Sequence, residues 1–163
     1  MNEKKDITVA FTGHRSYQGE ADAALREVVR EMYDRGFRRF LVGMAWGFDL
    51  AAGKAVMALK TQYADVELVA VVPYEGFRHL FRDESLALYD EVATAADEVI
   101  VVSEIGGNMS FVRRNNFLVD NSAVVIAWWI HGVKGGTSYT VKRAVKQGRE
   151  FRNLCPPREL ELF

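Results

Sequence analysis

The sequence is poor in cysteine and proline, with one cysteine, Cys155, and three prolines among 163 residues. A single cysteine excludes an intrachain disulfide and a metal site built from several cysteines. Long apolar runs are missing too, because the longest, residues 123–130, falls far short of the ~18 residues of a membrane span. The polar start lacks the apolar region and cleavage site of a signal peptide. We therefore expect a cytoplasmic protein with no membrane partner.

An excess of charge of either sign is also missing, since 21 basic and 22 acidic side chains leave a net charge of −1. This balance excludes a uniformly basic nucleic-acid coat and an acidic disordered tail. The charge is nevertheless divided along the chain. Residues 1–109 hold 12 basic and 18 acidic side chains, whereas residues 110–152 hold 8 basic and 2 acidic ones. Such a division marks an anionic partner or reflects solvated helix faces.

Short apolar runs alternate along the chain with longer segments of helical period. We expect strands over 7–11, 39–42, 66–72, 98–102, 123–129 and 151–154, and helices that include 25–32, 49–60, 77–95, 111–120 and 138–147. Gly36 and Gly148 end the first and last helices, and the 77–95 segment is open to a break near Asp83. Continuous apolar strands indicate burial on both faces. The pattern predicts one domain over residues 1–163, a Rossmann-like three-layer α/β/α sandwich with a mostly parallel sheet.

In such sheets ligands bind beyond the carboxyl ends of the strands, so the loops that follow the strands are the places to search. The first expected strand leads into Gly13, His14 and Arg15. A glycine there lets the backbone approach a ligand, and an arginine can contact phosphate or carboxylate through two N–H groups. A tight turn with a solvated arginine and a packing histidine explains the same residues. No G-x-G-x-x-G pattern follows, so the usual dinucleotide fingerprint is absent.

The second expected strand leads into a helix through Gly43, Met44 and Gly47, with Asp49 at the start of that helix. Two glycines four residues apart before a helix suit a group of N–H donors around an anion or a ribose. Asp49 either caps the helix or contacts a ribose hydroxyl. After the third expected strand, Glu75 either caps the helix that follows or contacts a sugar hydroxyl.

The loop after the fifth expected strand carries the strongest phosphate-binding pattern. Gly135, Gly136 and Thr137 open a helix there and bring backbone donors, a hydroxyl group and the helix dipole together. The spacing of a P-loop is missing, which argues against a P-loop NTPase. On the preceding helix, Arg114 and Asn115 add a cation and an amide beside an apolar stripe. A solvated helix face is the alternative interpretation of these two residues.

Taken together, these motifs resemble the YpsA-like family of the SLOG superfamily of Rossmann-like domains. The stretches that carry the resemblance are TGHR at 12–15, GMAWGFD at 43–49, RNNFLVD at 114–120 and GGT at 135–137. They occur in family order, within a resemblance that spans residues 6–148. The superfamily includes the LOG phosphoribohydrolases, often labelled lysine decarboxylase-like, and the DNA-processing protein DprA. The resemblance implies a domain that binds nucleotides or nucleotide-derived ligands and forms homo-oligomers.

The resemblance to the LOG enzymes is incomplete at their catalytic motifs. Those enzymes pair the helix arginine with a lysine, whereas here Arg114 is followed by Asn115. They also carry a glutamate where this chain has Thr140. Cleavage of an N-glycosidic bond needs a carboxylate to stabilise an oxocarbenium ion or to activate water. LOG-type hydrolysis would therefore require Glu75, Asp49 or Asp120 to take over.

The sequence thus favours binding of a nucleotide or nucleotide-derived ligand, such as NAD or ADP-ribose, by a sensor or regulatory domain. The alternatives are a nucleotide N-glycosidase and, less favoured by the charge balance, single-stranded DNA binding as in DprA. We expect no required cofactor, no metal and no nucleic-acid partner. Trp46, Phe77 and Phe111 line either the pocket or a subunit contact. The expected ligand-binding residues are Gly13, His14, Arg15, Gly43, Met44, Gly47, Asp49, Glu75, Arg114, Asn115, Gly135, Gly136 and Thr137.

Overall fold

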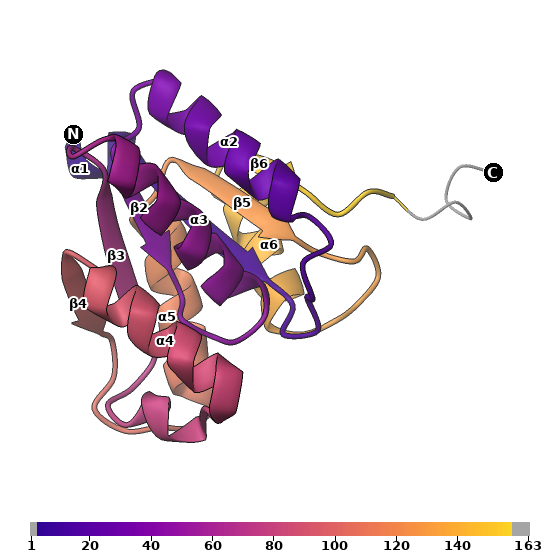
Figure 1. Cartoon of the computed structure of the whole chain (residues 1–163). Helices are drawn as coiled ribbons and strands as arrows, with labels where there is room; N and C mark the ends of the chain where they lie inside the picture. Colours follow the sequence, from indigo (N-terminus) through magenta and orange to yellow (C-terminus); the bar gives the residue numbers. More distant parts are fainter. Residues whose placement is uncertain (1–2, 158–163) are drawn as a thin grey trace.

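A computed structural model describes residues 3–157 of the chain and contains one six-stranded sheet (Figure 1). The strands are β1 (Thr8–Gly13), β2 (Arg39–Val42), β3 (Glu67–Val72), β4 (Glu98–Val101), β5 (Val124–Trp128) and β6 (Glu150–Asn153). They lie in the order β4-β3-β2-β1-β5-β6, and every neighbouring pair is parallel. The predicted strands are confirmed with small shifts of their ends.

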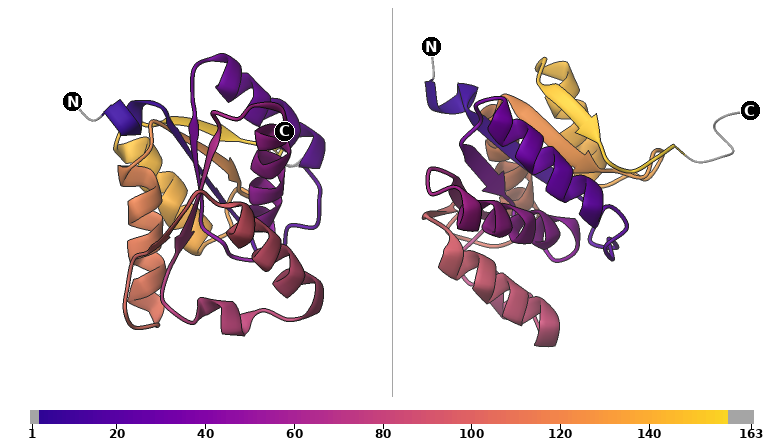
Figure 2. Two further views of the ribbon diagram at one scale, coloured as in Figure 1. Left: turned by 60° about the vertical axis from the view of Figure 1, so that its left-hand side comes forward. Right: turned by 45° about the horizontal axis from the view of Figure 1, so that its top comes forward.

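Helices cover both faces of the sheet, which confirms the Rossmann-like three-layer architecture (Figure 2). The helices are α1 (Glu3–Asp6), α2 (Asp22–Asp34), α3 (Phe48–Gln62), α4 (Asp83–Ala95), α5 (Asn108–Asp120) and α6 (Gly136–Lys146), with a 3-10 turn η1 (Phe77–Leu80). Helices α2, α3 and α4 pack on one face, and α5 and α6 lie together on the other (Figure 1). The segment 77–95 is broken as expected near Asp83, whose φ of 49° interrupts the helical backbone. The short helix α1 was not predicted.

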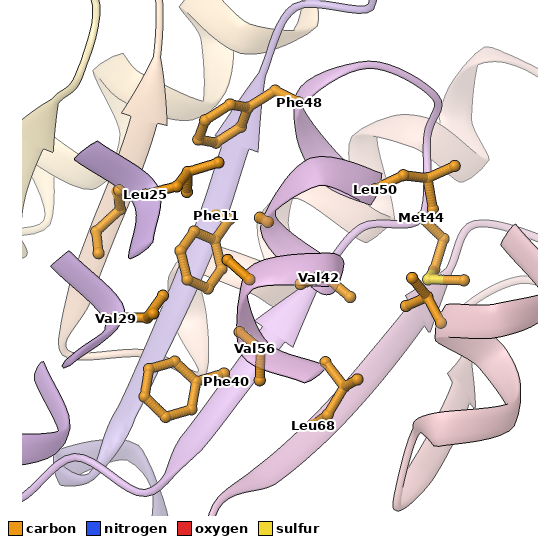
Figure 3. Packing of buried hydrophobic residues seen from close by; sticks show 14 of the residues in the cluster. Phe11, Leu25, Val29, Phe40, Val42, Met44, Phe48, Leu50, Val56 and Leu68 are labelled. Atoms are coloured by element: carbon orange, nitrogen blue, oxygen red, sulfur yellow. The ribbon is translucent and has the colours of Figure 1, made fainter. Parts of the chain in front are cut away.

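The core follows from the alternation of side chains along buried strands. Val9 and Phe11 face α2 and α3, while Ala10 between them faces α5. Figure 3 shows Phe11 and Phe40 packed among aliphatic side chains of α2 and α3. Burial on both faces is therefore confirmed for β1, β2, β3 and β5, but the prediction is wrong for β4 and β6. These two strands are the edges of the sheet, where fewer neighbours cover them.

The order of the strands determines where a ligand site can form. From β1 the chain adds β2, β3 and β4 on one side, and then crosses the sheet to place β5 on the other side of β1. The loops after β1 and β5 consequently diverge to opposite faces. A crevice opens at this switch point, beyond the carboxyl ends of the two strands.

Candidate functional site

A cavity of about 410 Å³ lies at this switch point. Four separate segments of the chain line it: the loop after β1, the start of α3, one side of α5 and the loop that opens α6. The lining residues are Thr12, Gly13, His14, Arg15, Ser16, Ala45, Asp49, Phe111, Arg114, Asn115, Leu118, Lys134, Gly135, Gly136 and Thr137. The fold thus brings together nine residues that the sequence analysis singled out as ligand-binding.

The N-terminus of α6 opens into this cavity without a side-chain cap. Its N-cap is Gly135, which has a φ of 140° that an L-residue with a side chain rarely adopts. The first N–H groups and the positive end of the helix dipole are therefore available to an anion. Thr137 in the first turn is only 8% exposed, and its hydroxyl has no hydrogen-bond partner within residues 3–157.

Arg114 and Asn115 lie opposite, on α5, and both are buried. The Arg114 guanidinium donates through Nε to Asn115 Oδ1 at 2.8 Å and through Nη1 to the carbonyl of Gly43. These bonds orient both side chains. The Nδ2 amide of Asn115 has no acceptor in the described part of the chain, and it lies 3.5 Å from where a Cβ on Gly136 would be. This amide and the Thr137 hydroxyl therefore belong to two largely buried residues, on different helices, that line the same cavity.

Asp49 is the carboxylate that lines the cavity, and it does not cap α3. That helix begins at Phe48 with Gly47 as its N-cap, so the capping interpretation is wrong. Asp49 Oδ2 instead accepts a hydrogen bond from the Ala45 N–H at 3.2 Å. Burial raises the pKa of Asp49 to about 6, although the charges of Arg114 and Arg15 and the Ala45 N–H oppose this. Burial also lowers the pKa of Arg114.

Gly43 and Gly47 support the site from behind rather than lining it. A Cβ on Gly43 would come within 2.9 Å of Asp49 Oδ2 and 3.1 Å of Arg114 Nη1, so only glycine leaves room for both charged groups. Gly47 has a φ of 84°, and a Cβ there would lie 2.6 Å from the Arg15 carbonyl oxygen. Met44 between them is fully buried in the core, with a φ of 67°.

His14 connects the two loops that flank the switch point. Its Nε2 accepts a hydrogen bond from the Ile130 N–H at 3.0 Å, so the ring carries its proton on Nδ1. Burial lowers the pKa of His14, which favours this neutral form. Arg15 is exposed, and its guanidinium lies over the Trp46 ring at 4.4 Å and the Phe111 ring at 5.4 Å. The histidine thus positions the loop after β5, and two aromatic rings hold Arg15 at the cavity.

Several residues expected at the site lie outside the cavity lining. Glu75 is exposed, and it does not cap η1, whose N-cap is Gly76 without a side-chain bond. Asp120 accepts hydrogen bonds from Arg143 at 2.9 Å at the far end of α5. Phe77 is a fully buried core residue. Arg113, the neighbour of Arg114 on α5, also lies outside the lining and donates to the Ser103 hydroxyl at 3.2 Å.

The cavity lining also includes two residues that were not among the expected ligand-binding residues. Ser16 lies outside every quoted motif, whereas Leu118 belongs to RNNFLVD and lines the cavity because one turn of α5 separates it from Arg114. Within residues 3–157 there is no group of three or more His, Cys, Asp or Glu side chains that could hold a metal ion. No helix in the same range is both long and apolar enough to span a membrane.

The fold and the site define a Rossmann-like domain of the SLOG type. Residues 9–154 match the model of the YpsA family, described as the YspA SLOG family, and the chain belongs to this family. It is 27% identical to the SPbeta prophage-derived protein YoqJ of Bacillus subtilis over 138 residues, which cover 76% of this chain and 80% of YoqJ. It is 20% identical to a UPF0398 protein of Bacillus velezensis over 126 residues, which cover 76% and 69% of the two chains.

Two solved structures of DprA share the fold. The DprA of Streptococcus pneumoniae matches 88% of this chain with a TM-score of 0.64 and 22% identity. The DprA of Helicobacter pylori, described with a single-stranded DNA binding mode, matches 89% with a TM-score of 0.64 and 20% identity. This chain covers only 48% and 63% of those two chains. At this level of identity the likeness is one of fold.

Proposed function

We propose that the cavity binds a nucleotide or nucleotide-derived ligand with a phosphate at the N-terminus of α6, and that the chain acts as a sensor or regulatory domain. The observation that carries this is a pair of donors that have no partner among residues 3–157, Asn115 Nδ2 and the Thr137 hydroxyl. They belong to two largely buried residues that line the cavity beside the uncapped helix start. Phosphate oxygens would satisfy both donors at once.

The remaining lining residues complete the proposed complex. Arg114 and Arg15 would neutralise the phosphate from two sides, and the backbone of Gly13 would approach it closely. Asp49 would accept a hydrogen bond from a ribose hydroxyl. The cavity volume of about 410 Å³ lies in the range of small-molecule sites. ADP-ribose and NAD belong to the ligands to test.

A thermal-shift series tests this proposal with AMP, ADP-ribose, NAD and inorganic phosphate. We expect at least one nucleotide to raise the melting temperature, by about 5–10 °C at a hundredfold excess over Kd. Thr137→Val should raise the Kd for that nucleotide about tenfold or more, because the Thr137 hydroxyl would donate a hydrogen bond to a charged phosphate oxygen. Arg114→Gln should abolish the shift.

Arg113→Ala is the matched control, because Arg113 is on the same helix but outside the cavity. It should leave the shift unchanged. Circular dichroism checks whether Arg114→Gln is folded. If Arg114→Gln is unfolded, the result for Thr137→Val decides the test. Absence of stabilisation by every nucleotide, or equal stabilisation of wild type and Thr137→Val, would overturn the proposal.

Cleavage of a nucleotide N-glycosidic bond is a second function that one observation favours. Asp49 lines the cavity with a pKa of about 6, which suits a general acid or base near neutral pH. Thr140, at the position of the LOG glutamate, is buried and donates to the Gly136 carbonyl at 2.8 Å, so it supports the helix instead. In this alternative Asp49 would be the catalytic carboxylate.

Release of free base from nucleoside monophosphates measures this activity. If it occurs, Asp49→Asn should lower the rate by a factor of about 100 or more. Glu75→Gln and Asp120→Asn should have no effect, since both carboxylates lie outside the cavity lining. Base release that survives Asp49→Asn would rule out the proposed role of this residue.

Binding of single-stranded DNA is the third candidate function to test. The likeness to the H. pylori DprA weakens the expectation that nucleic acid is not a partner, because that protein is described with a single-stranded DNA binding mode. A gel shift with an oligothymidylate at low salt supplies the comparison. Binding of the oligonucleotide without any nucleotide-dependent stabilisation would favour this function over the sensor.

A further inference from the structure

The exposed apolar side chains of this molecule are concentrated in one short segment. Among the described residues, eight large hydrophobic side chains are exposed, and four of them lie between residues 99 and 109. These four, here called the β4 apolar segment, are Val99 (52% exposed), Val101 (48%), Ile105 (80%) and Met109 (59%). Scattered exposed hydrophobics are normal, but such a cluster indicates an interaction surface.

Two of these four residues, Val99 and Val101, lie on β4, an unprotected edge of the sheet. Strand β4 pairs only with β3, so its outer backbone groups are open to another strand. Of the four residues of β4, only Glu98 is charged, and it forms an ion pair with Arg39 at 3.2 Å. The opposite edge, β6, differs because it carries two charged residues, Glu150 and Arg152, and no exposed large hydrophobic side chain. Charges of this kind normally prevent edge-to-edge pairing.

We propose that β4 pairs antiparallel with β4 of a second copy of this chain, so that one continuous sheet crosses a twofold axis. In a twofold pair of strands each residue faces a partner residue on the same side of the sheet. With the axis at Ile100, Val99 faces the partner's Val101, and Val101 faces the partner's Val99. Both exposed valines are then covered by valines.

The two exposed valines select this register from its neighbours. With the axis at Ile100, each of them faces a valine of the partner. With the axis at Val101, Val99 would face the partner's Ser103, and with the axis at Val99, Val101 would face the partner's Asp97. Of these three registers, the one at Ile100 is therefore the one that covers both valines with apolar side chains.

Sedimentation equilibrium over the micromolar range tests the pairing. Wild type should be a dimer at the higher concentrations, and Val101→Lys should be monomeric because it places a charge against an apolar strand. Val145→Lys is the matched control, since Val145 is a 59% exposed valine on α6 outside the segment. It should remain a dimer. A monomeric wild type, or a dimer that Val101→Lys leaves intact, would overturn the proposal.

A disulfide test covers the case in which Val101→Lys fails to fold. In a Cys155→Ser background, Ile100→Cys places two thiols opposite each other across the axis. Their Cα atoms would be about 5.5 Å apart, within the range for a disulfide. Oxidation should yield a covalent dimer of Ile100→Cys and none of Val145→Cys. Equal cross-linking of the two variants would contradict the register.

Discussion

At the scale of single residues, Asp49 is the most informative side chain. It is 5% exposed, it lines the cavity at the switch point, and its partners only partly compensate for the loss of water. The pKa of this carboxyl is raised to about 6 from an ordinary value of 3.8. A carboxyl with a raised pKa beside Arg114 is the kind of group that the proposed binding role requires.

The raised pKa has a consequence for stability that can be measured. The folded protein binds the Asp49 proton more tightly than the unfolded chain, so this group stabilises the fold below pH 3.8. That contribution is lost as the pH rises through about 6. A shift of this size corresponds to about 3 kcal/mol. In Asp49→Asn, which keeps an acceptor for the Ala45 N–H, the loss should not occur.

The measurement compares the free energy of unfolding of wild type and Asp49→Asn in urea at pH 4.5 and pH 7.5. Other carboxylates titrate in both proteins and cancel in the difference. We expect Asp49→Asn to gain stability relative to wild type as the pH rises. A difference that is independent of pH would show that Asp49 does not titrate in this window.

At the scale of elements, the turn between β2 and α3 shows how a loop is shaped by its neighbour. Helix α3 starts where Gly47 lies against the backbone of the loop after β1, and the Phe48 N–H donates to the His14 carbonyl at 3.2 Å. The glycines of this turn were evident in the sequence. The backbone groups that pack against them could not be predicted, because the packing of two loops from different strands leaves no periodic pattern in the sequence.

Gly47→Ala should destabilise the protein more than Gly148→Ala. Both glycines have a positive φ, 84° and 72°, which costs an alanine about 1–2 kcal/mol. A Cβ at position 148 would meet open space. A Cβ at position 47 would lie 2.6 Å from the Arg15 carbonyl oxygen, and this clash costs about 1–3 kcal/mol more. Urea unfolding of the two variants measures the difference. Equal losses would show that the loop moves aside without cost.

At the scale of the whole molecule, the division of charge along the chain has a local explanation. Several basic residues of the 110–152 segment are engaged within the fold: Arg143 with Asp120, Arg152 with Glu31 and Arg149 with the Val119 carbonyl. Arg114 and Lys134 are the members of that segment that line the cavity. The segment therefore directs two cations toward the cavity, while Arg143, Arg149 and Arg152 are held by other groups of the fold.

The alternation of strand and helix patterns was enough to predict the class of fold, because parallel strands with covering helices are the arrangement that buries every apolar run. It did not predict that β4 and β6 are the edges, since strand order depends on which crossover changes direction. The exposed valines of β4 were therefore expected to be buried. Only the assembled sheet shows that β4 and β6 form its edges.

The sequence by itself determined the Rossmann-like fold, the family and the loops that surround the cavity at the switch point. Local periodicity and short motifs indicate these features, and both depend on residues that are close together in the chain. The tertiary structure alone decided that Asp49 reaches the cavity while Glu75 and Asp120 do not. It also joined Arg114 to Gly43 and Ile130 to His14, contacts that span 71 and 116 residues. Such contacts arise only when the crossover from β4 to β5 brings distant segments to one edge of the sheet.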